Sequence, residues 1–238
     1  MTRAPGGRAS TWRRSLGATR RGSGLARSAG LVVLGIVAGA ASLASCWRAA
    51  PVIVDFSTPA REYRSAEYHD VYERWTRHEK IMSGVEPALE VWVTYKSQEF
   101  RQAFVAHYAE TYAMKEEARE TLRRTQLEAG AAAYEFEVTA QSANYKWNDL
   151  EKKSSPWRVL LVDGAGHELT AERITVERLP DLFEREFYPA KTPFSKTYLI
   201  RFIRGGHEDG FTGERSGQLA LRFAGPLGST DLRWSNRP

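Results

Sequence analysis

The sequence predicts an α+β or mainly β protein, built as an antiparallel β-sandwich with one helix before it and a long helical insertion within it. The first observation is a set of seven short segments, rich in β-branched and aromatic residues, in which apolar and polar positions alternate. The second is a pair of longer stretches with apolar residues at helical spacing. The third is the glycine and proline turns between these segments. An immunoglobulin-like arrangement is one form that this strand number fits.

The first 45 residues have the organisation of a signal peptide. Before Leu31 there are seven arginines and no acidic residue, and residues 28–45 carry no charge. The most apolar part, residues 31–41, is short for a bilayer span and suits the hydrophobic region of a secretory signal. An uncleaved membrane anchor is the alternative interpretation of the same run.

The end of this run, Leu43-Ala44-Ser45-Cys46, resembles the lipobox of bacterial lipoproteins at all four positions. The resemblance implies cleavage of the signal between Ser45 and Cys46 and attachment of lipid to the Cys46 thiol. It also implies a membrane-associated protein of the cell envelope that faces the periplasm or the cell exterior. Trp47 stands where an aspartate would favour retention in the inner membrane, so the outer membrane is slightly favoured.

Removal of the signal changes the charge balance of the chain. The whole chain has a formal net charge of +5, but seven positive charges lie in the signal, so the remainder carries −2. A nucleic-acid partner is therefore not expected, because such a partner requires a basic face on the folded domain. Cys46 is also the sole cysteine. Its lipidation would exclude disulfides and thiolate chemistry from the rest of the chain.

Residues 46–58 are predicted to be a tether, and residues 59–238 to be a single globular domain. Within the tether, residues 52–54 are a candidate first edge strand. Thr58 and Pro59 form a helix-start signal, and Ser83 and Gly84 a stop signal. The apolar spacing between them predicts a helix over 59–82, with its buried stripe at Tyr68, Val71, Tyr72, Trp75 and Met82.

The sandwich is expected over residues 88–96 and 133–238, with the helical insertion over 97–130 between its first two strands. Ser97 is expected to cap this helix and Gly130 to stop it. An unbroken helix of this length would extend about 50 Å, at 1.5 Å per residue. The highly charged residues 115–124 predict that its second half lies on the surface.

One predicted strand precedes the insertion and six follow it. The turn at residues 163–166 predicts a hairpin between the strands on either side of it, and residues 180–188 predict a helical turn. The strands are expected at 89–95, 133–139, 157–162, 174–176, 197–203, 217–223 and 231–234. The C-terminal run over residues 222–234 resembles the C-termini of uncharacterised bacterial lipoproteins, which implies no activity.

Local motifs predict no catalytic residue, no cofactor and no metal site. Ser216-Gly217 lies outside any Gly-x-Ser-x-Gly frame, and no phosphate-binding loop is present. His207-Glu208-Asp209 is a weak candidate for a cation-binding loop. A metal site would need histidines that lie far apart in the sequence to converge in space, because none has the spacing of a local ligand motif: His69, His78, His107, His167 and His207.

One connector between strands is a candidate ligand-binding loop, formed by Tyr145, Trp147, Asn148 and Asp149. Aromatic rings beside amide and carboxylate groups suit the recognition of a sugar or peptide, through stacking and hydrogen bonds. The alternative, which we favour, is that Trp147 folds back onto the sandwich, because large aromatic side chains at the base of loops are commonly buried.

These observations favour a lipid-anchored envelope protein with a non-enzymatic binding or assembly role. The membrane would be contacted through the lipid on Cys46, and an envelope protein partner through helix 97–130. A carbohydrate- or peptidoglycan-binding module is the alternative that the Trp147 loop suggests. An envelope hydrolase with an unrecognised site is a third hypothesis, which requires histidine and carboxylate side chains to converge in a pocket.

Overall fold

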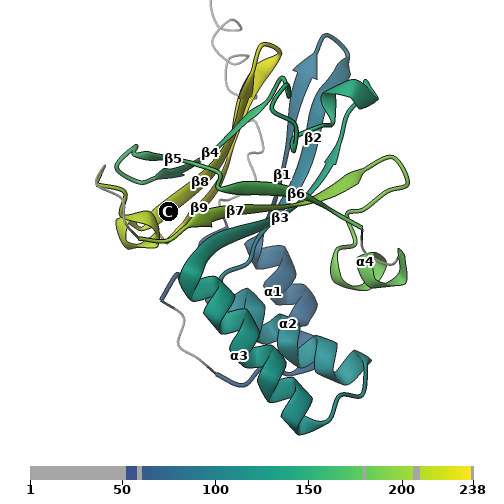
Figure 1. The fold of residues 1–238 in the computed structure, drawn as a ribbon, viewed down its shortest axis with the longest axis vertical. Helices are drawn as coiled ribbons and strands as arrows, with labels where there is room; N and C mark the ends of the chain where they lie inside the picture. The colour runs from purple at the N-terminus through teal and green to yellow at the C-terminus, as the bar shows by residue number, and fades with distance from the viewer. Residues whose placement is uncertain (1–51, 58–60, 179–180, 206–209, 237–238) are drawn as a thin grey trace, which may run out of the picture. The chain divides into compact units, whose positions relative to one another are not determined.

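The computed structural model contains two antiparallel β-sheets with few helices, as expected for an α+β or mainly β protein (Figure 1). It describes residues 52–57, 61–178, 181–205 and 210–236. The predicted signal, Cys46, the helix start at Thr58-Pro59 and the candidate cation loop at residues 207–209 lie outside these ranges. No helix in the described ranges is long and apolar enough to cross a membrane.

The larger sheet has five strands, in the order β1-β2-β3-β7-β6, and the smaller has four, in the order β5-β4-β8-β9. Every pair of neighbouring strands is antiparallel. The five-stranded sheet contains β1 (Thr76–Ser83), β2 (Glu86–Tyr95), β3 (Ala133–Gln141), β7 (Lys196–Ile203) and β6 (Arg173–Glu177). The four-stranded sheet contains β5 (Glu168–Thr170), β4 (Arg158–Asp163), β8 (Gln218–Gly225) and β9 (Gly228–Ser235).

All seven predicted strands are present, as β2, β3, β4, β6, β7, β8 and β9, and the structure adds β1 and β5. The seven strands could be predicted because apolar and polar residues alternate along them. In β3 the apolar side chains of Tyr134, Phe136 and Val138 point to one face, and the intervening polar side chains point to the other. Burying a large apolar side chain of this kind contributes about 1.5–3 kcal/mol.

Aromatic side chains connect the two sheets in the core. The Trp234 ring of β9 lies 6.0 Å from the Tyr95 ring of β2 and 5.4 Å from the Phe136 ring of β3, measured between centroids. Its indole Nε1–H donates a hydrogen bond to the carbonyl oxygen of Trp75 at 2.9 Å. Trp234 is therefore buried with its polar group satisfied, as large aromatic residues in cores usually are.

The prediction of one helix over 59–82 is wrong beyond Trp75. A 3₁₀ turn (Ser65–Glu67) leads into α1 (Tyr68–Trp75), and the chain then becomes β1. Every residue of β1 pairs with β2, from Thr76 opposite Thr94 to Ser83 opposite Glu86. β1 is an edge strand and only Ile81 is buried in it. Charged edge strands lack the apolar alternation that identifies a strand in a sequence, so no sequence pattern marks the end of the helix at Trp75.

The prediction of one long helix over 97–130 is also wrong. The insertion forms two helices, α2 (Gln98–Thr111) and α3 (Glu116–Ala132), which fold back on each other beside α1 (Figure 1). Between them, Ala113 has a φ of 46°, a left-handed conformation that ends α2. The Ser97 cap is confirmed, because its Oγ accepts a hydrogen bond from the Phe100 amide at 3.1 Å.

Gly130 was predicted to stop a helix, and this prediction is wrong because Gly130 lies inside α3. A Cβ atom at this position would lie 2.9 Å from Nε of Arg101, a buried residue of α2. The glycine is therefore explained by the close approach of the two helices rather than by the end of one.

The predicted hairpin between residues 157–162 and 174–176 is wrong as well. β4 pairs with β5, whereas β6 pairs with β7 in the other sheet. The three-residue strand β5 is too short to show alternation in the sequence. The helical turn predicted at 180–188 is confirmed as α4 (Asp181–Phe187). The candidate edge strand at 52–54 makes one isolated parallel bridge, between Ile53 and Ser235.

Candidate functional site

The connector with the candidate ligand-binding residues is only partly exposed. Tyr145 is 77% exposed and lies with Trp147 in a 3₁₀ turn (Tyr145–Trp147). Trp147 is half-buried against the core, and its carbonyl oxygen accepts a hydrogen bond from Trp157 Nε1 at 2.8 Å. The ring thus folds back toward the domain, while Tyr145 remains available for stacking.

Asn148 and Asp149, which complete this connector, are buried. The Asn148 Nδ2 group donates to the carbonyl oxygen of Ala140 at 2.7 Å, and its Oδ1 accepts from the Tyr198 hydroxyl at 3.0 Å. These hydrogen bonds tie the connector to β3 and β7. The structure therefore does not bring the four side chains together on one exposed surface, and Asn148 has a structural role.

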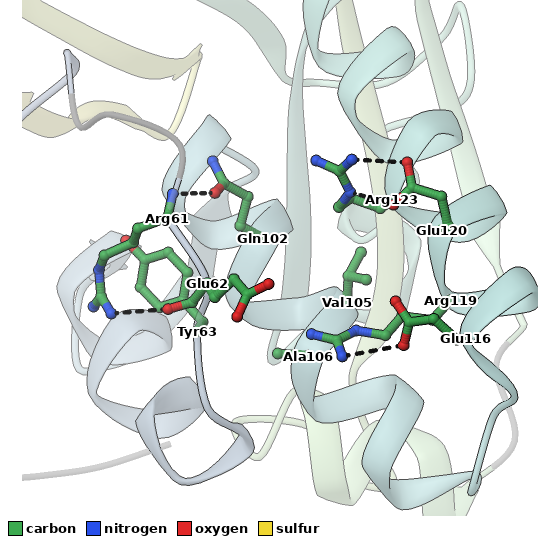
Figure 2. A pocket seen from close by; sticks show the side chains of 10 residues that line it. All are labelled: Arg61, Glu62, Tyr63, Gln102, Val105, Ala106, Glu116, Arg119, Glu120 and Arg123. Atoms are coloured by element: carbon green, nitrogen blue, oxygen red, sulfur yellow. Dashed lines mark hydrogen bonds and ion pairs between the residues drawn. The ribbon is translucent and has the colours of Figure 1, made fainter.

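A cleft of about 330 Å³ lies on the helix hairpin, and we call it the hairpin cleft (Figure 2). Its floor is the side of α2 that carries Gln102, Val105 and Ala106. The segment before α1 forms one wall and the first half of α3 the other. The residues that line these walls are mostly charged and of both signs: Arg61, Glu62, Tyr63, Glu116, Arg119, Glu120 and Arg123.

Gln102 is the polar group at the bottom of the hairpin cleft. Its side chain is buried, and Oε1 accepts a hydrogen bond from the Arg61 amide at 3.0 Å. Its Nε2 group has no hydrogen-bond partner among the described residues. A buried donor without a partner costs about 1–3 kcal/mol, and this Nε2 group is closed off from solvent.

The charged walls of the hairpin cleft are paired within themselves. Arg123 forms a two-pronged contact with Glu120 at 2.7 Å, and Arg119 lies 3.5 Å from Glu116. Such exposed pairs contribute about 0–1 kcal/mol each. In addition, α3 has no buried residue. The wall can therefore exchange these pairs for contacts with another molecule at little cost.

The segment before α1, which forms the other wall of the hairpin cleft, is held more firmly than the α3 wall. Arg61 Nη2 donates to the Glu67 carboxylate at 2.9 Å, and the Arg64 amide donates to the same side chain at 2.8 Å. The guanidinium of Arg61, followed by the Arg64 amide, lowers the pKa of Glu67 to about 2. Glu67 is therefore ionised throughout the physiological pH range and keeps Arg61 at the edge of the cleft.

A second polar cluster surrounds His107 of α2. Its Nδ1 lies 2.7 Å from the Ser65 Oγ, and its Nε2 lies 2.8 Å from a carboxylate oxygen of Glu186 in α4. His69 of α1 lies beside it, with the two imidazole centroids 5.6 Å apart. Sequence reasoning missed this cluster because its members come from separate helices; His107 and Glu186 are 79 positions apart.

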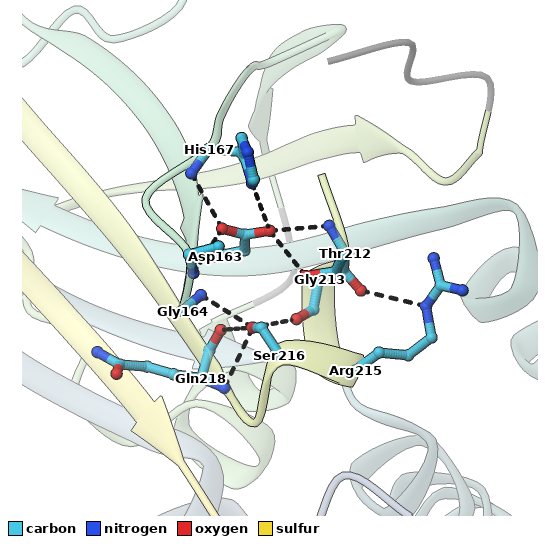
Figure 3. Close-up of polar contacts among 9 residues, drawn as sticks. Asp163, Gly164, His167, Thr212, Gly213, Arg215, Ser216 and Gln218 are labelled. Carbon is cyan, nitrogen blue, oxygen red and sulfur yellow. Dashed lines mark hydrogen bonds and ion pairs between the residues drawn. The ribbon is translucent and has the colours of Figure 1, made fainter. Parts of the chain in front are cut away.

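A third polar cluster joins two loops of the four-stranded sheet (Figure 3). Asp163 accepts hydrogen bonds from the amide and hydroxyl of Thr212, at 2.8 and 2.9 Å, and from the amides of Ala165 and His167, at 2.9 and 3.0 Å. Burial would raise the pKa of Asp163, but these donors, Thr212 first, lower it to about 2. The carboxylate is thus fully used as an anchor between the loops.

Ser216 belongs to the same cluster. Its Oγ accepts from the Gly164 amide at 2.8 Å and lies 2.6 Å from the carbonyl oxygen of Gly213, to which it donates. A nucleophilic serine needs a base to receive its proton, whereas this hydroxyl is engaged with backbone groups. The cluster is therefore assigned to loop structure.

Comparisons with known proteins assign no family to the chain. No family model matches it, and no curated protein matches it. A crystal structure described as a novel protein of unknown function from Burkholderia pseudomallei is similar to it, with 14% sequence identity and a TM-score of 0.37. The similarity covers 75% of this chain and 94% of that one.

Proposed function

We propose that this chain is a lipid-anchored protein of the cell envelope, with a non-enzymatic role in binding or assembly, and that its hairpin cleft receives a segment of another envelope protein. The anchor is the lipid on Cys46 that the lipobox resemblance implies. The observation that carries the binding role is the hairpin cleft itself, where charged walls of both signs stand on either side of the floor formed by α2.

The charges of the hairpin cleft favour a protein segment over a simple ion. Arginines and glutamates alternate around it (Figure 2), so neither an anion nor a cation meets a wall of one sign. A polypeptide segment that carries both acidic and basic side chains can pair with both. Complementary charges of this kind set orientation and specificity more than affinity.

We further infer that the two sheets form an immunoglobulin-like β-sandwich, which presents the helix hairpin. When the seven strands β2, β3, β4, β6, β7, β8 and β9 are lettered A to G, the observed strand orders become A-B-E-D and C-F-G. These are the orders of constant-type immunoglobulin domains. The contacts of the Trp234 ring of β9 with Tyr95 and Phe136 of the other sheet support this inference. The hairpin is then an insertion between strands A and B.

Site-specific photocrosslinking in cells tests the binding role. A photoreactive amino acid in place of Glu62, on the rim of the hairpin cleft, is expected to yield an adduct with one envelope protein, identified by mass spectrometry. The same probe in place of Arg124, an exposed α3 residue that does not line the cleft, should not yield it. Reversal of two wall charges, by Arg119→Glu with Arg123→Glu, should abolish the Glu62 adduct.

The matched control carries the same change of net charge away from the cleft. Arg124→Glu combined with Arg173→Glu alters two exposed arginines outside the lining, and it should leave the Glu62 adduct intact. Adducts of equal yield from the Glu62 and Arg124 probes, or an adduct that survives reversal of the wall charges, would contradict a binding role for the hairpin cleft.

A further inference from the structure

The cluster around His107 has donor atoms suited to a metal ion. One atom each from His69, His107 and Glu186 can be chosen so that all three lie within 4.8 Å of one another. Metal–nitrogen and metal–oxygen bonds of about 2.0–2.2 Å hold two ligand atoms of one ion within about 4.4 Å of each other, so small side-chain movements bring these donors into range. The three residues belong to α1, α2 and α4, so the convergence is produced by the packing of three helices.

The backbones that carry these donors are locked together by the residues next to them. Tyr68, which precedes His69, donates from its hydroxyl to the carbonyl oxygen of Phe187 at 2.8 Å, and Phe187 follows Glu186. Both Tyr68 and Phe187 are fully buried. This hydrogen bond fixes α1 against α4, and it therefore holds the backbones of His69 and Glu186 at a constant separation.

The same two aromatic rings also fix the imidazole of His107. The Tyr68 ring stacks on it, with centroids 4.7 Å apart and planes inclined by 10°, and the Phe187 ring lies 5.0 Å from it. His107 is buried, whereas His69 is exposed and the Glu186 side chain is 45% exposed. His107 is thus a rigid, buried inner donor, and His69 and Glu186 are two outer donors that solvent reaches.

Ser65 completes the arrangement by contacting the other imidazole nitrogen. With Nδ1 protonated and donating to the Ser65 Oγ, the lone pair of Nε2 faces the Glu186 carboxylate. In the other tautomer Nε2 donates to Glu186 and the Ser65 hydroxyl donates to Nδ1, whereas in this tautomer the two acceptors can hold a cation between them. Histidines that bind metals characteristically donate their second N–H to a neighbouring oxygen in this way, which fixes the tautomer.

We propose that His69, His107 and Glu186 form a binding site for a divalent transition-metal ion such as Zn²⁺, with Ser65 as the residue that positions His107. Imidazole nitrogens favour transition metals over Mg²⁺ and Ca²⁺. Two histidines and one glutamate leave a coordination position for water or another ligand, as in zinc sites that are not purely structural. This site is independent of the hairpin cleft and of its proposed partner.

Metal titration of the full chain in detergent tests the site. After treatment with a chelator, the wild type is expected to bind one Zn²⁺ per chain, measured by calorimetry, and an excess of Mg²⁺ should not displace it. Loss of a group that only orients a ligand costs about 10–100-fold in affinity. Ser65→Ala is therefore expected to weaken binding about tenfold, and loss of a ligand, in His69→Ala or Glu186→Gln, by more than about 100-fold.

His78→Ala is the matched control, because His78 is a part-exposed histidine that pairs with Glu90, outside the cluster. Its Zn²⁺ affinity should equal that of the wild type. Substitution by Co²⁺ gives a second readout, a visible absorption band that should shift in Glu186→Gln. Circular dichroism is expected to show that the His69→Ala variant is folded, because His69 is exposed. Absence of saturable Zn²⁺ binding by the wild type, or wild-type affinity in both His69→Ala and Glu186→Gln, would overturn the proposal.

Discussion

Replacing Arg101 by methionine is expected to lower the free energy of unfolding by about 3–5 kcal/mol, the usual cost of removing one partner from a buried ion pair. Arg101 is 1% exposed, and its Nη2 lies 2.7 Å from the Glu135 carboxylate of β3. Its Nε and Nη1 donate to the carbonyl oxygen of Lys96 and to Gln126 of α3, at 2.9 and 3.0 Å. One guanidinium thus connects the helix hairpin to the five-stranded sheet.

Urea unfolding followed by tryptophan fluorescence measures this loss. The control Arg123→Met removes an exposed arginine that pairs with Glu120, and it should cost no more than about 1 kcal/mol. The double variant Arg101→Met with Glu135→Leu should recover most of the loss, because it removes the carboxylate that Arg101→Met leaves buried. If Arg101→Met and Arg123→Met have equal effects, the buried pair does not hold the hairpin to the sheet.

The second large effect is a fall in stability between about pH 4.5 and pH 7 that Glu137 causes. Glu137 of β3 is 3% exposed, and its Oε1 has no partner among the described residues. Burial raises its pKa to about 7, from the ordinary 4.5, and Glu177 and Glu184 add to the shift against the opposing effect of Lys96.

The direction of this pH effect follows from the number of protons that the folded and the unfolded chain bind at Glu137. Below pH 4.5 both the folded and the unfolded chain hold the Glu137 proton, and its stabilising contribution is fully present. As the pH rises toward 7 the unfolded chain releases this proton first, so folding becomes less favourable. At about 1.4 kcal/mol per pKa unit, the contribution lost by pH 8 is about 3 kcal/mol.

Unfolding free energies at pH 5 and pH 8 are expected to differ much less in Glu137→Gln than in the wild type, and the variant should be the more stable protein at pH 8. Glu90→Gln is the matched control, because Glu90 is equally buried but has a lowered pKa beside Lys80 and His78. The Glu90→Gln variant should show the same difference in unfolding free energy between pH 5 and pH 8 as the wild type. The assignment to Glu137 is wrong if its variant shows the same difference between pH 5 and pH 8 as the wild type.

Much of the fold could be predicted because alternation and turn residues are local signals. The strands that the sequence analysis missed, β1 and β5, lack these signals: β1 is a charged edge strand and β5 is three residues long. The break between α2 and α3 depends on the left-handed Ala113, which no glycine marks. At Gly130 a stop was predicted where the helix continues, because a glycine that is needed for close packing against Arg101 cannot be told in the sequence from one that ends a helix.

The candidate sites were less predictable than the fold. The charged half of the insertion was expected on the surface, and it forms one wall of the hairpin cleft. The opposite wall comes from the segment before α1, and Gln102 on the floor of the cleft looks like any helical glutamine in the sequence. The cluster of His69, His107 and Glu186 depends on three helices that meet only in the folded domain, so no spacing rule could identify it.

Lipidation at Cys46 is the claim on which the proposed location depends, and metabolic labelling with a fatty-acid probe tests it most directly. The wild type is expected to incorporate the probe, and Cys46→Ala to incorporate none. Ser45→Ala is the matched control, because it keeps a small residue before the cysteine and should be labelled like the wild type. Labelling of Cys46→Ala at the level of the wild type would contradict lipidation at this residue and, with it, the proposed anchor.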